Sequence, residues 1–165
     1  MYTVDYFISK LQLKPHIEGG FFKELYHNSQ IISAQPERQN DEQRYLSSTI
    51  YYLLRSGEVS RFHKLKSDEI WFYHYGAPAI IHVIDEFGQL KSFKLGLNAD
   101  EGENPQLLIP ANQIFGAEVL ENDSFSLVSC MVSPGFDYAD FELFAAETLI
   151  KRYPQHKDLI LKLNG

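Results

Sequence analysis

The chain has 165 residues, 44% of them hydrophobic, which is enough to fill one core. Its formal net charge is −7, whereas a nucleic-acid backbone or an anionic membrane requires a basic face. We therefore expect one domain over residues 1–165 that binds a small-molecule ligand, with no nucleic acid and no membrane as partner. The N-terminus lacks the basic start and apolar run of a secretion signal, so the expected location is cytoplasmic.

The first 47 residues predict a helix, a strand and a long polar segment. Residues 4–11 carry apolar side chains at the spacing of one helical face. Residues 21–27 alternate, so the predicted strand places Glu24 and Tyr26 on one face. Residues 28–47 are polar, and a segment of this length is either a lid or an inert surface loop.

The remainder of the chain predicts a β-domain with a helical end. From residue 48 onward, short stretches rich in Tyr, Ile, Val and Phe alternate with turn residues, which indicates a sandwich or barrel. The barrel is expected over about residues 20–144. Residues 145–165 predict two short helices, with Pro154 in the first turn of the second. The fold class is therefore all-β with flanking helices.

The most informative spacing lies in residues 57–76. Gly57, His63, Glu69 and Gly76 stand at the places of the glycines, the first histidine and the glutamate of the first cupin motif, which this stretch resembles. Leu65 stands where that motif has its second histidine. The resemblance implies a cupin-type jelly-roll β-barrel.

The same resemblance bears on metal binding. Metal-binding cupins hold an ion with two histidines and a glutamate of this motif and a third histidine from a later one, whose place here is taken by Phe115. Leu65 and Phe115 thus occupy two of the four ligand places, and two protein ligands rarely hold a divalent ion. We expect no metal and no other cofactor.

Longer matches sharpen the resemblance. The segments 14–20, 48–54, 62–71, 106–110 and 132–142 resemble the Cupin_5 (DUF985) family over nearly the whole chain. This resemblance implies a jelly-roll barrel that is often dimeric, so a homodimer is the expected assembly. The chain departs from the family pattern at Asn112 and Ile114, usually glycine and tryptophan, which affects the shape of one pocket wall.

Metal-independent epimerases and isomerases of this fold use a histidine base, a carboxylate partner and often a tyrosine acid. His63 with Glu69 as its orienting carboxylate, and Tyr51, Tyr73 or Tyr26 as the acid, supply such a set. The alternative is that His63 and Glu69 are a hydrogen-bonded polar remnant inside the barrel.

Polar residues among aromatic ones indicate an open, partly hydrated cavity, because they are costly in a closed core. The residues expected at its wall are Glu24, Tyr26, Leu65, Trp71, Gln106 and Phe115. We predict a metal-independent cupin that binds a small polar or aromatic molecule, with isomerisation or epimerisation of a sugar or sugar nucleotide as the enzymatic hypothesis. A non-catalytic binding or sensing cupin is the first alternative, and a metal-dependent oxygenase with atypical ligands is the second.

Overall fold

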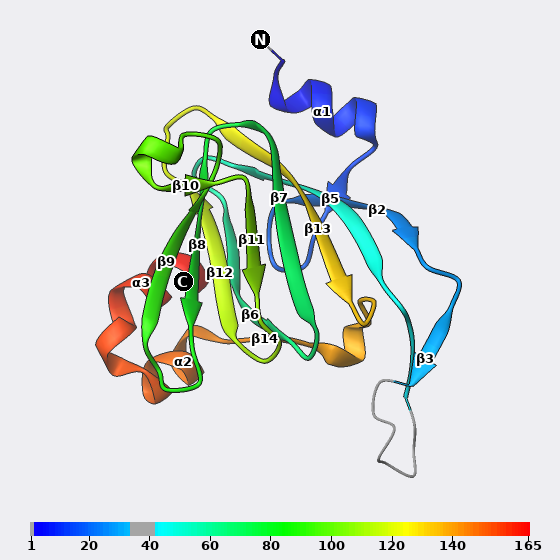
Figure 1. The fold of residues 1–165 in the computed structure, drawn as a ribbon. Helices are drawn as coiled ribbons and strands as arrows, with labels where there is room; N and C mark the ends of the chain where they lie inside the picture. Colours follow the sequence, from blue (N-terminus) through cyan, green and yellow to red (C-terminus); the bar gives the residue numbers. More distant parts are fainter. Residues whose placement is uncertain (1, 34–41) are drawn as a thin grey trace.

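The computed structural model describes residues 2–33 and 42–165, whose main strands pair into two six-stranded sheets that face each other (Figure 1). The first sheet has the order β1 (Lys14–Pro15), β2 (Phe21–His27), β5 (Ser48–Arg55), β13 (Phe125–Ser133), β7 (Asp68–Gly76) and β11 (Gln106–Ile109). The second has the order β10 (Glu103–Asn104), β9 (Leu90–Leu95), β8 (Ala79–Ile84), β12 (Ile114–Val119), β6 (Val59–Leu65) and β14 (Phe141–Leu143). The predicted β-architecture is confirmed, although the described strands pair as two separate sheets where the sequence predicts one barrel.

Apolar side chains from the two facing sheets fill the space between them. The largest of these are Tyr52, Leu54, Trp71, Ile81 and Phe115, all almost fully buried. They alternate along their strands with side chains that point outward, because successive residues of a strand project to opposite faces. The inner faces of both sheets therefore define the core, and the space that their side chains leave open is available to a ligand.

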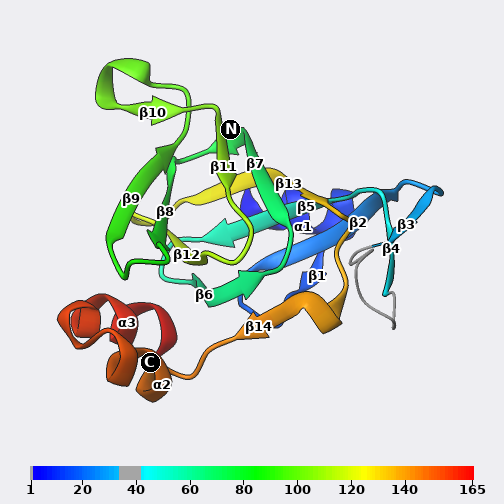
Figure 2. The same ribbon diagram turned by 60° about the horizontal axis from the view of Figure 1, so that its bottom comes forward.

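Helices cover the outer faces of the sheets, as Figures 1 and 2 show. The N-terminal helix α1 (Val4–Leu11) packs on the outside of the first sheet, where Phe7 and Ile8 meet Leu53 and Phe125. The C-terminal helices α2 (Ala146–Arg152) and α3 (Lys157–Asn164) pack on the second sheet. Short 3₁₀ turns complete the fold: η1 (Ala99–Glu101), η2 (Tyr138–Asp140) and η3 (Pro154–His156). Among the described residues, no helix is long and apolar enough to span a membrane.

The segment 28–47 contains structure that its polar composition does not predict. Strands β3 (Ile31–Ser33) and β4 (Gln43–Tyr45) pair in antiparallel register. Arg44 in β4 binds both carboxylate oxygens of Asp140, at 2.7 Å from Nε and 3.1 Å from a terminal nitrogen. Residues 34–41, on which the lid hypothesis also depends, lie outside the described part of the chain.

Candidate functional site

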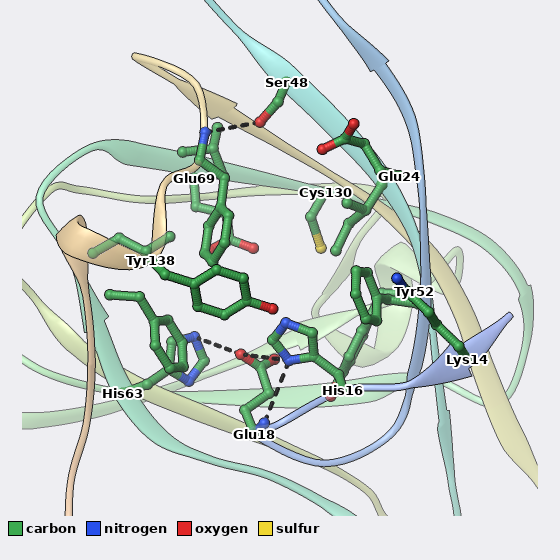
Figure 3. Close-up of a pocket in the computed structure, with 16 residues that line it drawn as sticks. Lys14, His16, Glu18, Glu24, Ser48, Tyr52, His63, Glu69, Cys130 and Tyr138 are labelled. Atoms are coloured by element: carbon green, nitrogen blue, oxygen red, sulfur yellow. Dashed lines mark hydrogen bonds and ion pairs between the residues drawn. The ribbon is translucent and has the colours of Figure 1, made fainter. Parts of the chain in front are cut away.

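A cavity of about 290 Å³ opens between the two sheets (Figure 3). Its wall is mainly apolar and aromatic, with side chains from β2, β5, β6, β7, β13 and β14 and from the segment around η2. Polar groups reach it from several of these elements. They are Lys14, His16, Glu18, Glu24, Ser48, Tyr52, His63, Glu69, Cys130 and Tyr138. A cavity of this size with a few convergent polar groups has the features of a small-molecule site.

Glu18 lies at the centre of the polar groups, because the turn before β2 brings it against β6. Gly19 and Gly20 have φ angles of +116° and +67°, and a Cβ atom on Gly19 would lie 2.0 Å from the carbonyl oxygen of Val59. The close approach thus requires glycine. The Glu18 carboxylate accepts a hydrogen bond of 2.9 Å from the Ser60 hydroxyl and lies 3.4 Å from the imidazole nitrogens of both His16 and His63.

His63 is held by oxygen atoms at both ring nitrogens. Its Nδ1 lies 2.7 Å from the backbone carbonyl of Arg61, and its Nε2 lies 3.4 Å from Glu18 Oε2. A backbone carbonyl only accepts hydrogen bonds, so Nδ1 carries a proton. Nε2 faces a carboxylate oxygen, which also requires a proton on Nε2 if the carboxylate is ionised. The two oxygen atoms thus fix the orientation of the His63 ring, with its Nε2 edge toward Glu18.

The surroundings of Glu18 favour its ionised form. Burial by itself would raise the pKa of this carboxyl. The charge of His63 and the hydrogen bonds from His16 and Ser60 together outweigh burial and lower the Glu18 pKa below its ordinary value. Glu18 thus carries a negative charge inside the cavity at neutral pH.

Glu69 faces the same cavity in the opposite protonation state. It lies near the start of β7 and is only 6% exposed. Burial, and then the negative charge of Glu18, raise the Glu69 pKa from 4.5 to about 8, while Cys130 and Trp71 oppose part of the rise. Glu69 is therefore mostly a neutral carboxylic acid at pH 7. One cavity holds an ionised and a protonated glutamate.

The structure gives His63 a different carboxylate partner from the one that the sequence predicts. His63 and Glu69 both line the cavity, but the carboxylate beside the imidazole is that of Glu18. Glu18 precedes β2 by three positions, and only the tertiary contact of its turn with β6 brings it to His63. The one signal in the sequence was its place beside Gly19 and Gly20, in a segment that also resembles the family.

The structure does not bring the predicted tyrosine acids to the cavity. Tyr51 points to the outer face of its sheet, where it packs in the cluster beneath α1, and Tyr52 is the residue of β5 that lines the cavity. The Tyr52 hydroxyl donates to the carbonyl of Gly19 at 2.8 Å, and burial, followed by the charge of Glu18, raises its pKa. Tyr73 packs near the core, four positions along β7 from Glu69, and its hydroxyl donates to the Gly76 carbonyl.

The predicted pocket residues divide into two groups. Glu24 and Leu65 line the cavity. Tyr26 does not, because β2 has a β-bulge after Glu24: residue 24 pairs with Ile50, whereas residue 26 pairs with the neighbouring Thr49. One extra residue moves every later side chain to the opposite face, and Tyr26 is half-exposed on the outside.

The three remaining pocket predictions fall in the core or on the surface. Trp71 is buried and contacts Tyr52 edge to face, with ring centroids 5.6 Å apart. Phe115 is buried behind His63, with ring centroids 4.1 Å apart, so it supports the imidazole without lining the cavity. Gln106 begins the edge strand β11 and is exposed.

The residues at the motif positions do not fit a divalent metal. Leu65 and Phe115 place carbon atoms where metal-binding cupins have histidines, and His63 is held by Glu18. Over residues 2–33 and 42–165, no group of three or more His, Cys, Asp and Glu side chains is placed to hold an ion.

Two facing sheets, a ligand-sized cavity between them and a His–Glu spacing on two consecutive strands are the features of a cupin. The chain matches the family model described as Cupin_5, Cupin superfamily (DUF985), over residues 5–144, and it belongs to this family. It is also 31% identical over 159 residues to the uncharacterized protein YML079W of Saccharomyces cerevisiae, covering 90% of this chain and 79% of that protein.

Solved structures show the same relationship. The protein SO0799 from Shewanella oneidensis is 45% identical with a TM-score of 0.90, and the match covers 100% of this chain and 99% of that one. A hypothetical protein from Leishmania major is 35% identical with a TM-score of 0.90, over 99% of both chains. Oxalate decarboxylase of Bacillus subtilis shares the fold alone, at 16% identity and a TM-score of 0.56, over 93% of this chain and 37% of that one.

Proposed function

We propose that this chain is a metal-independent cupin that binds a small molecule in the cavity of a jelly-roll barrel and transfers protons on it, as an isomerase or epimerase. The observation that carries the proposal is the pairing of an ionised Glu18 with a protonated Glu69 in one cavity. Two carboxyl groups whose surroundings drive their pKa values apart supply a base and an acid at the same pH. A buried arrangement of this kind stabilises a fold poorly, which favours a role in chemistry.

Glu18 and Glu69 can carry out a sequence of proton transfers that needs no oxidant or reductant. Glu18 accepts a proton from a carbon next to a carbonyl group, and Glu69 donates its proton to the carbonyl oxygen, which gives an enol. With a hydroxyl group on the neighbouring carbon, this enol is an enediol. Glu69 then takes the proton of the second hydroxyl, and Glu18 returns its proton to the former carbonyl carbon, so the carbonyl group moves to the neighbouring carbon. The His63 imidazole orients Glu18 through the 3.4 Å contact. Tyr52 is not assigned as the acid, because its hydroxyl already donates to Gly19.

The shape of the cavity favours a single ring as substrate. Aromatic side chains give it flat walls, on which a sugar ring or another planar body stacks. A volume of about 290 Å³ lies at the lower end of the range for ligand pockets. A sugar fits it, whereas the nucleotide part of a sugar nucleotide would extend beyond the mouth, where Lys14 and Tyr138 lie.

Hydrogen exchange tests the proton-transfer proposal. The protein is incubated in D₂O with a panel of aldoses, ketoses and small hydroxyketones, and NMR follows the replacement of carbon-bound hydrogen by deuterium. Exchange by the parent is expected to fall by about 100-fold or more in Glu18→Gln and in Glu69→Gln. Glu86→Gln, at an exposed position in the turn between β8 and β9, is the matched control and is expected to retain the parental rate.

The second candidate function is binding or sensing without chemistry. It is favoured by the mainly apolar wall, which binds a ligand without needing either carboxyl group. Calorimetry separates the two candidates: a compound that binds in the cavity but exchanges no hydrogen in D₂O would support the binding module and contradict the enzyme.

We also propose that two chains pair through the free part of the β2 edge. Strand β1 pairs only with Phe21 and Phe22, so within the described residues the rest of this edge carries no further strand of the sheet. Exposed apolar side chains gather on β2 and the neighbouring hairpin, namely Leu25, Tyr26, Ile31 and Tyr45. An exposed edge with apolar side chains favours association, because pairing covers both.

A further inference from the structure

The cavity wall combines aromatic rings with carboxyl groups. Its rings are Phe22, Tyr52, Phe136, Tyr138 and Phe141, and its carboxyl groups are Glu18, Glu24 and Glu69. The face of an aromatic ring is electronegative, so a cage of such rings attracts a positive charge. Carboxylates in the same wall act in the same direction. The basic side chains of the same wall are the exposed Lys14 and the two imidazoles of His16 and His63, which both lie beside Glu18. The remaining rings and carboxyl groups fit an organic cation better than an anion.

One cation of the chain itself already uses this wall. The Lys14 ammonium lies 5.1 Å from the centre of the Phe22 ring, which is a cation–π contact. Lys14 is exposed at the mouth, so its charge is largely solvated there. The aromatic lining therefore accommodates a positive group, while the interior beyond Lys14 remains open for another.

The charged groups deeper in the cavity determine whether a cationic or an anionic ligand is favoured. Glu18 lies 3.4 Å from His63, so a positive charge on this imidazole is balanced by the carboxylate. Next to burial, the charge that Glu69 senses most is the negative one of Glu18. Glu18 therefore acts on Glu69 as a negative charge, although the Glu69 side chain is itself neutral. A cation that contacts Glu69 and displaces its proton is attracted by the new carboxylate, whereas an anion gains no such partner.

We infer that the ligand of this cavity is a small organic cation, an amine or ammonium group on an aromatic or alicyclic body, whose charged nitrogen contacts Glu69 and whose body packs against the aromatic wall. The inference rests on the proposed function only in assigning the ligand to this cavity, and it specifies the ligand class. A sugar ligand would accordingly be an amino sugar.

Proton release is the measurable consequence. A cation that contacts Glu69 favours its ionised form, so binding at pH 7 expels the Glu69 proton into solution. The other charged or titratable groups at the wall between pH 6 and 8 are Lys14, His16, Glu18, Glu24 and His63. Tyr52 and Cys130 also face the cavity, and burial raises the pKa of both, so they remain neutral. The difference in proton release between the parent and Glu69→Gln gives the number of protons that come from Glu69.

The test uses three probes of similar size and different charge: 2-phenylethylamine, 2-phenylethanol and phenylacetate. Isothermal titration calorimetry with the full chain is run in two buffers of different ionisation enthalpy, which gives the number of protons released. The amine is expected to bind about 10-fold or more tightly than the alcohol and the acid at pH 7. Its affinity is expected to rise by about 10-fold per pH unit from pH 6 to about pH 7.5, as ionisation of Glu69 becomes easier.

Two variants measure separately how much the Glu69 carboxyl group and the aromatic wall contribute to amine binding. Glu69→Gln is expected to abolish proton release and to weaken amine binding by about 10-fold or more, a larger loss than it causes for the alcohol. Tyr138→Leu, at the half-exposed mouth, is expected to weaken the amine more than the alcohol because it removes one ring of the cage. Glu86→Gln is the control for both, and the probe comparison on the parent does not depend on any variant folding.

Equal affinity for the three probes, tighter binding of phenylacetate, or failure of the amine to bind at millimolar concentration would each overturn the inference. Amine binding without proton release would overturn the contact with Glu69. These outcomes are distinct from failure of the proposed function: a site that prefers the amine but exchanges no hydrogen in D₂O confirms the ligand class and refutes only the proton transfer.

Discussion

Replacing Glu69 with glutamine is expected to change how protein stability depends on pH. The folded-state pKa of Glu69 is about 8 and its ordinary value is 4.5, so the folded protein binds this proton more tightly than the unfolded chain does. The stabilising effect of the proton is fully present below pH 4.5 and is lost as the pH rises to about 8. Glutamine has nearly the same shape and no ionisation, so Glu69→Gln lacks this dependence.

The magnitude follows from the two pKa values. Each pH unit between them reduces the free energy of unfolding of the parent, relative to Glu69→Gln, by about 1.4 kcal/mol. Over the whole interval the relative loss is about 5 kcal/mol, and above about pH 8 the difference becomes constant. Glu18, whose pKa is lowered, contributes to the pH dependence of both proteins and largely cancels in the comparison.

Urea denaturation at a series of pH values from about 5 to about 9 measures this difference. The fluorescence of Trp71, the one tryptophan of the chain, and the circular dichroism of the β-sheets give two independent transitions. Glu86→Gln is the control and is expected to follow the parent at every pH. A difference between the parent and Glu69→Gln that stays constant, or that grows in favour of the parent as the pH rises, would refute the buried neutral acid.

Three further predictions concern the fold and its assembly. Glu118→Ala is expected to lower the free energy of unfolding by about 2 kcal/mol, because the buried carboxylate contacts His82 at 3.1 Å and Lys162 of α3 at 2.5 Å; a loss below about 0.5 kcal/mol in urea denaturation would contradict it. Added Mn²⁺, Fe²⁺, Ni²⁺ or Zn²⁺ is expected to leave the melting temperature unchanged, since an ion that binds only the folded state raises it; a rise that disappears in His63→Ala would reveal a metal site. Light scattering at micromolar concentration is expected to give the mass of two chains, and Tyr26→Asp is expected to reduce it to one; a monomeric parent would rule out the β2 interface.

Much of the fold follows from local patterns in the sequence. The predicted helix over residues 4–11 and strand over residues 21–27 coincide with α1 and β2. The spacing and alternation of apolar residues depend on neighbouring residues alone, so they can be recognised in the sequence without the tertiary structure. His63 and Leu65 share a face for the same reason, since they are two apart on one strand, and Glu69 begins the next strand after a short turn; all three line the cavity.

Only the tertiary structure shows which face of each strand lines the cavity and which carboxylate lies beside His63. Alternation shows that Tyr51 and Tyr52 point to opposite sides, but only the packing of α1 against one side reveals which of them faces the cavity. The bulge after Glu24 is a property of the pairing of β2 with β5, and it turns Tyr26 outward. Glu18 reaches His63 because its turn packs on β6, a contact between residues about 40 positions apart. Strand periodicity is a local property of the chain, whereas the protonation of a buried glutamate depends on charges that distant segments bring to it.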